Sequence, residues 1–73
     1  MTRLEAAWMI VRAARLTPVR DPSITDLTME QDRLVVGALI RAGVATGQSG
    51  RFMPDRALTR AEAAKMLAAI VSS

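Results

Sequence analysis

The side chains that could do chemistry in this chain of 73 residues are arginines, carboxylates and a few glycines. Histidine, cysteine and tyrosine are all absent, which removes the most common general base, the thiolate nucleophile, thiolate zinc ligands and the phenol acid. Asp21, Asp26 and Asp32 lack the alternating spacing of a calcium-binding loop. The composition therefore predicts a protein that is not an enzyme and that holds no metal and no cofactor.

Arginine dominates the charge, which is formally +3, and Lys65 is the only lysine. Such an excess suits an anionic partner: nucleic acid, an acidic polysaccharide or a membrane surface. The arginines are spread evenly along the chain, however, which indicates solvated helix faces for most of them. Trp8 and Phe52 are the only aromatic residues, so platforms for stacking bases are nearly absent. We expect no nucleic-acid partner.

The apolar residues do not indicate a membrane segment. No apolar run approaches the roughly 18 residues that a membrane span needs. Glu5 and Arg12 interrupt the first apolar stretch, so we expect no secretory signal there and no membrane insertion.

Three capping boxes, of the form Thr-x-x-Glu/Gln, predict the helices that must position these groups. They are Thr2 with Glu5, Thr28 with Gln31, and Thr59 with Glu62, and each precedes apolar residues at helical spacing. The first helix should end near Leu16, because Pro18 follows, and the second at Ala42, with Gly43 as the left-handed residue after it. Residues 17–27 and 43–58 should form ordered loops, and 51–53 could be a very short extended segment. The predicted fold is all-α, with three helices and two loops.

The chain also contains an internal repeat. The segment Thr2-Arg3-Leu4-Glu5-Ala6-Ala7-Trp8-Met9 matches Thr59-Arg60-Ala61-Glu62-Ala63-Ala64-Lys65-Met66 at every position except the third and the seventh. Two Ala-rich amphipathic helices could share a capping box by chance, but an identical Thr-Arg-x-Glu-Ala-Ala-x-Met pattern favours a true repeat.

The second half carries a more extended pattern, Gly43-Val44-x-x-Gly47-x-x-Gly50-x-Phe52-x-Pro54-Asp55-x-x-Leu58-Thr59-Arg60-Ala61-Glu62-x-Ala64-x-Met66-Leu67. This pattern resembles the S-layer homology (SLH) repeat, and Ile24-Thr25-Asp26-Leu27 looks like the segment that opens one. By this resemblance, residues 24–73 are one SLH-like repeat, 17–23 are a connector, and 1–16 are the closing helix of a preceding repeat. It also implies that the unit is completed by self-association or by neighbouring repeats.

The resemblance implies attachment to cell-wall polysaccharide, often an anionic, pyruvylated polymer, and a location at the cell envelope or secreted and bound to the wall. It points to Arg60 and Arg3, at equivalent positions in the first helical turn, where an arginine and free N–H groups could together bind a carboxylate. Asp26, Gln31, Gly47 and Gly50 complete the predicted polysaccharide site. Gln31 stands where family members usually carry tryptophan, and the Gly47–Gly50 loop is short. Alternatively, Arg60 could pair with Glu62 or Asp55, or pack on Phe52.

The sequence therefore leaves three function classes. The first is a non-catalytic envelope-binding module. The second is an oligomerisation module of the same fold that does not bind sugar, which the missing tryptophan and the short loop favour. The third, ranked last, is a small basic nucleic-acid binder. A chain of this size buries a small core without any staple, so we also expect a homo-oligomer.

Overall fold

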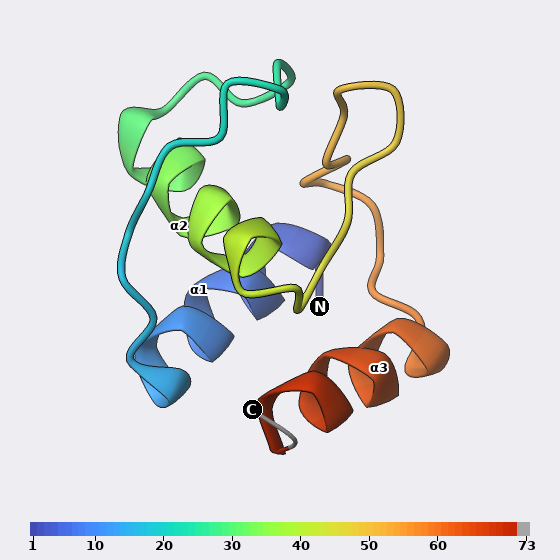
Figure 1. The fold of residues 1–73 in the computed structure, drawn as a ribbon. Coiled ribbons are helices and arrows are strands. Elements are labelled where there is room, and N and C mark those ends of the chain that lie inside the picture. Colours follow the sequence, from blue (N-terminus) through green and yellow to red (C-terminus); the bar gives the residue numbers. More distant parts are fainter. Residues whose placement is uncertain (72–73) are drawn as a thin grey trace.

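The computed structural model describes residues 1–71, and within this range its regular structure is helical. The helices are α1 (Arg3–Ala14), α2 (Glu30–Arg41) and α3 (Arg60–Val71), joined by two ordered loops (Figure 1). The only β-type pairings among the described residues are isolated bridges, Thr2 with Ala57 and Gln48 with Arg51. The all-α prediction is confirmed.

Two of the three predicted capping boxes form. The Glu5 N–H donates to Thr2 Oγ1 (3.1 Å) while the Thr2 N–H donates to Glu5 Oε1 (2.8 Å). The Glu62 N–H likewise donates to Thr59 Oγ1 (3.1 Å), and the Thr59 N–H donates to Glu62 Oε1 (3.0 Å). These reciprocal bonds satisfy N–H groups that the first helical turn leaves without a partner. The two copies of the repeat therefore begin their helices in the same way.

The box predicted at Thr28 and Gln31 is wrong. Helix α2 begins at Glu30, with Met29 as its N-cap, and no side chain caps it. Leu27 is buried, and its carbonyl accepts a hydrogen bond from Nε of Arg33 (2.9 Å). This tertiary contact holds the chain before α2, so that the helix starts one residue later than the local pattern predicts.

The helix ends agree better with the sequence. Helix α1 ends at Ala14, two residues before the predicted end, and Arg15 adopts a left-handed conformation (φ 53°). Helix α2 ends at Arg41, and Gly43 has a φ of 75°. The Gly43 N–H donates to the Ile40 carbonyl (3.1 Å) and the Val44 N–H to the Leu39 carbonyl (2.9 Å). These two bonds make the Schellman motif that the glycine predicts.

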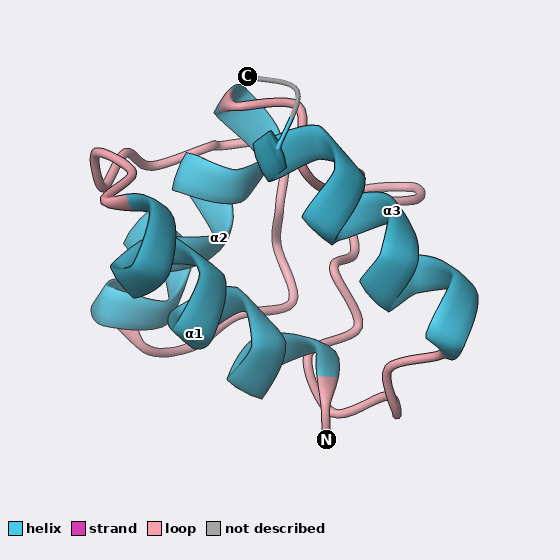
Figure 2. Cartoon of the chain, turned by 90° about the horizontal axis from the view of Figure 1, so that it is seen from below, coloured by secondary structure: helices cyan, strands magenta, loops and turns pink. Residues whose placement is uncertain are grey.

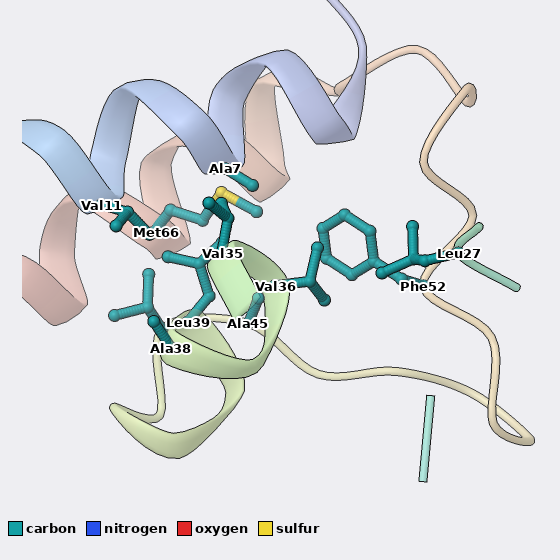
Figure 3. Packing of buried hydrophobic residues seen from close by; sticks show 11 residues of the cluster. Ala7, Val11, Leu27, Val35, Val36, Ala38, Leu39, Ala45, Phe52 and Met66 are labelled. Atoms are coloured by element: carbon teal, nitrogen blue, oxygen red, sulfur yellow. The ribbon is translucent and has the colours of Figure 1, made fainter. Parts of the chain in front are cut away.

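The core lies between α1, α2 and the long second loop, and α3 reaches it through one buried side chain. Val36, Leu39 and Phe52 are the largest fully buried residues. Figure 3 shows Met66 extending from α3 towards the side chains of α1 and α2. Apart from Met66, the apolar side chains of α3 are partly or fully exposed, and Leu67 (58%) and Val71 (85%) lie mostly in solvent. Helix α3 therefore packs against the core along a narrow face.

The connector between α1 and α2 crosses α2 at Gly37. The Val19 N–H donates to the Leu34 carbonyl (3.2 Å), and a Cβ placed at Gly37 would lie 1.8 Å from the Val19 carbonyl oxygen. Only glycine leaves room for this crossing. On the other side of α2, Trp8 Nε1 of α1 donates to Asp32 Oδ1 (3.0 Å), which ties the first two helices together.

The two repeat copies lie side by side. Helices α1 and α3 run in the same direction in Figures 1 and 2, and backbone hydrogen bonds join the N-terminal end of α1 to the segment that precedes α3. The Arg3 N–H donates to the Arg56 carbonyl (2.9 Å), and the Leu58 N–H donates to the Met1 carbonyl (2.8 Å). Arg3 and Arg60, at equivalent positions of the repeat, are therefore near the same end of the molecule.

Candidate functional site

A cavity of about 250 Å³ opens where the starts of α1 and α3 meet the second loop. It is lined by Arg3, Thr46, Gln48, Arg51, Phe52, Met53, Arg56 and Glu62. Three of these side chains are arginines and one is a carboxylate, so the cavity has a cationic wall. We call it the arginine cavity.

Arg3 forms the inner wall of the arginine cavity and is held by several partners at once. Its side chain is only 8% exposed and makes an ion pair with Glu62. Nε donates to the Phe52 carbonyl (2.9 Å), Nη2 donates to the Thr46 carbonyl (3.3 Å), and Cζ lies 4.5 Å from the centroid of the Phe52 ring. A buried guanidinium requires such pairing, because burial of an unpaired charge is strongly unfavourable. Arg3 is thereby a fixed positive charge that also joins α1 to the second loop.

Glu62 links the two repeat copies electrostatically. Its carboxylate pairs with Arg3 of α1 and with Arg56 of the second loop. The hydrogen bond from the Thr59 backbone N–H lowers the pKa of Glu62, and the Thr59 hydroxyl and the charges of Arg3 and Arg56 lower it further. Glu62 is therefore ionised at neutral pH and keeps both arginines in place.

Asp26 holds the far side of the cavity by binding backbone. Its Oδ1 accepts from the Phe52 N–H (2.9 Å) and its Oδ2 from the Met53 N–H (2.8 Å). Met53 has a left-handed conformation (φ 60°), which the two bonds help to hold. Both carboxylate oxygens of Asp26 are thus engaged in positioning the loop segment that carries Phe52, and we call this pair of hydrogen bonds the Asp26 clamp.

The two predicted glycines allow the second loop to approach the segment before α2. A Cβ at Gly47 would lie 2.6 Å from Ile24 Cδ1, and one at Gly50 would lie 2.9 Å from the Ser23 carbonyl oxygen. Gly50 also has a φ of 77°, and its carbonyl accepts from the Thr25 N–H (2.8 Å). Figure 1 shows this loop and the connector meeting at one end of the molecule. The glycines therefore shape the loop that carries Gln48 and Arg51.

The structure brings together four of the six predicted site residues. Arg3 lines the arginine cavity, Asp26 anchors its loop, and Gly47 and Gly50 lie in the loop beside lining residues. Gln31 is exposed on α2 and does not line the cavity. Arg60 is exposed in the first turn of α3, does not line the cavity, and takes part in none of the ion pairs of residues 1–71. The ligand roles of these residues stay predictions.

The arginine cavity is also lined by Arg51, Arg56, Thr46 and Gln48, which no motif of the sequence identifies as site residues. The only signal for the two arginines is that they flank the Phe52-Met53-Pro54-Asp55 segment. Their convergence depends on the Asp26 clamp and on the fold of the loop, neither of which has a local sequence pattern. Arg51 is exposed, and the Arg56 side chain is 48% exposed, so both can reach a ligand.

The arrangement suits recognition of an anion. Guanidinium groups can bind a carboxylate with two parallel hydrogen bonds. The part of the chain that the structure describes contains no cluster of three or more side chains that could hold a metal ion. None of the helices in this part is long and apolar enough to cross a membrane.

A comparison with protein-family models matches residues 23–64 to the S-layer homology domain. No curated protein and no solved structure matches the chain significantly. The matched range covers more than half of the chain, and it includes the Asp26 clamp, α2, the second loop and the start of α3. On this evidence the chain belongs to the S-layer homology domain family.

Proposed function

We propose that the chain is a non-catalytic module that attaches a protein to anionic cell-wall polysaccharide through the arginine cavity. The S-layer homology family is one of cell-wall binding modules associated with the cell envelope, which supports attachment as the activity. The proposal adds that the ligand is an anionic polysaccharide and that residues of the arginine cavity contact it. A pyruvylated secondary polymer is the ligand class that we favour.

The observation that carries the proposal is the excess of arginine in an open cavity next to the family motif. Arg51 and Arg56 are exposed enough to bind, while Arg3 supplies a fixed charge behind them. The volume of about 250 Å³ is a little below that of typical ligand pockets, which are roughly 300–1,000 Å³. This size suits one acidic sugar unit of a chain that continues over the surface. A carboxylate on that unit would accept bidentate hydrogen bonds from Arg51 or Arg56.

The test is co-sedimentation of the chain with cell-wall sacculi, with and without their secondary polymer. Arg51→Ala and Arg56→Ala should each reduce polymer-dependent binding roughly tenfold or more, which corresponds to a lost charged hydrogen bond of about 1.5–3 kcal/mol. Arg41→Ala is the matched control, because Arg41 is an exposed arginine on α2 that does not line the cavity. Circular dichroism of each variant checks that the fold is intact.

The same assay tests the role predicted for Arg60. Loss of binding in Arg60→Ala, with full binding in Arg51→Ala and Arg56→Ala, would move the site from the arginine cavity to the start of α3. Equal pelleting with and without the secondary polymer would contradict recognition of that polymer. No pelleting by the folded chain would contradict attachment altogether.

The alternative function is an oligomerisation module of the same fold without sugar binding. The observation that favours it is a second, wholly apolar cavity between α1 and α3, which is lined by Met1, Ala6, Met9, Ile10, Leu58, Ala63, Met66 and Leu67. Folded chain that self-associates but does not pellet with any wall preparation would support this alternative over the proposal above.

A further inference from the structure

The apolar cavity between α1 and α3 is an open groove of about 210 Å³. Met1 and Met9 on one side and Leu67 on the other are each more than half exposed, at 65%, 57% and 58%. Large apolar side chains gathered in one groove mark an association surface more often than scattered ones do. A partner that covers this groove would therefore present apolar side chains to it.

The internal repeat indicates which partner fits. Arg3 is the second residue of the first copy of the repeat, and it pairs with Glu62, the fourth residue of the second copy. The counterparts of these two residues are Arg60 and Glu5, and neither takes part in an ion pair of the described residues. The chain thus forms one arginine–glutamate link between its two copies and leaves the matching arginine and glutamate open for another.

The open charges lie at one end of the groove. Glu5 precedes Met9 by four residues on α1, and Arg60 precedes Ala63 by three residues on α3, so each charge lies one helical turn from a groove residue. Both helices run in the same direction (Figure 2), so both charges are at the N-terminal end. The hydrogen bonds from Thr2 lower the pKa of Glu5, so its carboxylate is charged at neutral pH.

We propose that a second copy of the chain covers this groove, with Arg60 of each copy pairing with Glu5 of the other. The arrangement is a twofold dimer in which α1 and α3 of both copies run parallel, with each α3 beside the α1 of the other copy. Under a twofold axis parallel to the helices, the contact between Arg60 of one copy and Glu5 of the other occurs twice, once in each direction. The interface is therefore closed and self-complementary. Its apolar centre and charged rim follow the usual anatomy of interfaces. The proposal does not depend on polysaccharide binding.

The first test is the oligomeric state, measured by sedimentation velocity over a range of concentrations. The unmodified chain should show a monomer–dimer equilibrium. Arg60→Glu should weaken the dimer roughly tenfold, because it replaces two attractive contacts with two repulsive ones. Leu67→Asp should abolish the dimer, and since Leu67 is exposed in the single chain, the fold should be kept. Arg41→Glu makes the same charge change on α2 and should leave the dimer unchanged.

A charge exchange keeps this test specific. Glu5→Lys alone also removes a capping-box partner of Thr2, so its thermal stability must be measured beside its association. The double variant Glu5→Lys/Arg60→Glu should regain dimerisation relative to Arg60→Glu, because the pair is restored with reversed sign. A chain that stays monomeric at high concentration would overturn the proposal, and so would an unchanged dimer in both Arg60→Glu and Leu67→Asp.

The second test is cross-linking, which the absence of cysteine makes simple. Arg60→Cys chain is mixed with Glu5→Cys chain, and a short bis-maleimide reagent is added, because an arginine–glutamate pair can hold the two Cα atoms farther apart than the roughly 7 Å that a disulfide spans. A cross-link between position 60 of one chain and position 5 of the other supports the arrangement. Cross-links that form only between identical chains, or none in a sample shown to be dimeric, would overturn it. Neither test uses polysaccharide, so failure of this proposal and failure of the proposed function are distinguishable.

Discussion

Helix propensity and the structure predict opposite effects on stability when Gly37 is replaced by alanine. In the interior of a helix, glycine is less favourable than alanine by about 1 kcal/mol, so propensity alone predicts that Gly37→Ala stabilises the chain. In the structure, the new Cβ would lie 1.8 Å from the Val19 carbonyl oxygen and 2.8 Å from its carbonyl carbon. Both are backbone atoms, so the clash cannot be relieved by a side-chain rotation. The connector must move away from α2.

The size of the effect follows from this displacement. Overpacking costs about 1–3 kcal/mol, and loss of the hydrogen bond between the Val19 N–H and the Leu34 carbonyl adds about 1 kcal/mol. After the gain in propensity, we expect a net loss of about 2 kcal/mol. In a domain of this size that lowers the Tm by about 8–16 °C.

Thermal unfolding followed by circular dichroism measures this change, and hydrogen exchange at the Val19 amide reports the connector directly. Gly43→Ala is a useful comparison, because no atom lies within 4 Å of its added Cβ and only the φ of 75° opposes alanine. Gly43→Ala should lower the free energy of unfolding by about 1–2 kcal/mol and should leave the Val19 amide normally protected from hydrogen exchange. A Tm of Gly37→Ala equal to or above that of the unmodified chain would refute the crossing at Gly37.

Three further changes test the core and the arginine cavity. Phe52→Ala should lower the free energy of unfolding by about 3–5 kcal/mol, because the ring is 1% exposed and also lies under Arg3, and chemical denaturation should show most of the stability gone. Asp26→Asn should lower it by about 1.5–3 kcal/mol, since an amide cannot accept from both the Phe52 and Met53 N–H groups; an unchanged denaturation midpoint would argue against the clamp. For Glu62, the folded pKa is lowered, so its contribution is present above the ordinary value of 4.5 and is lost as the pH falls through the folded value. Glu62→Gln should therefore be less stable than the unmodified chain at pH 7 and should lose less stability on acidification. Tm values measured at neutral and acidic pH test this. The same acid-induced loss of stability in both proteins would contradict it.

The helices could be predicted from the sequence because their signals are local. The Thr2 and Thr59 boxes involve residues three apart, and Gly43 acts on the turn that contains it. Thr28 has the same local pattern and fails, because the burial of Leu27 and its bond with Arg33 set the start of α2. A local pattern is reliable only where no tertiary contact competes with it.

The candidate site was less predictable because its contacts join distant residues. The place of Arg3 in the motif predicts that it binds a ligand, but its partners Phe52 and Glu62 are 49 and 59 positions away. These partners turn an exposed helix residue into a buried one. Arg51 and Arg56 come together only when the second loop folds around Phe52. The even spacing of arginines along the sequence therefore gives no sign of the arginine cavity.

The position of α1 indicates that the predicted repeat and the segments that fold around one core do not have the same boundaries. The sequence predicts that α1 closes one repeat, yet Ala7 and Val11 are part of the hydrophobic core formed with α2, and Arg3 lines the arginine cavity. In a tandem array built in this way, each closing helix would pack against two neighbouring repeats. The repeats would therefore not fold as independent domains. A fusion protein cut at the repeat boundary, after residue 23, should therefore expose Leu39 and Val35 and fail to fold, whereas a cut before α1 should give a stable module.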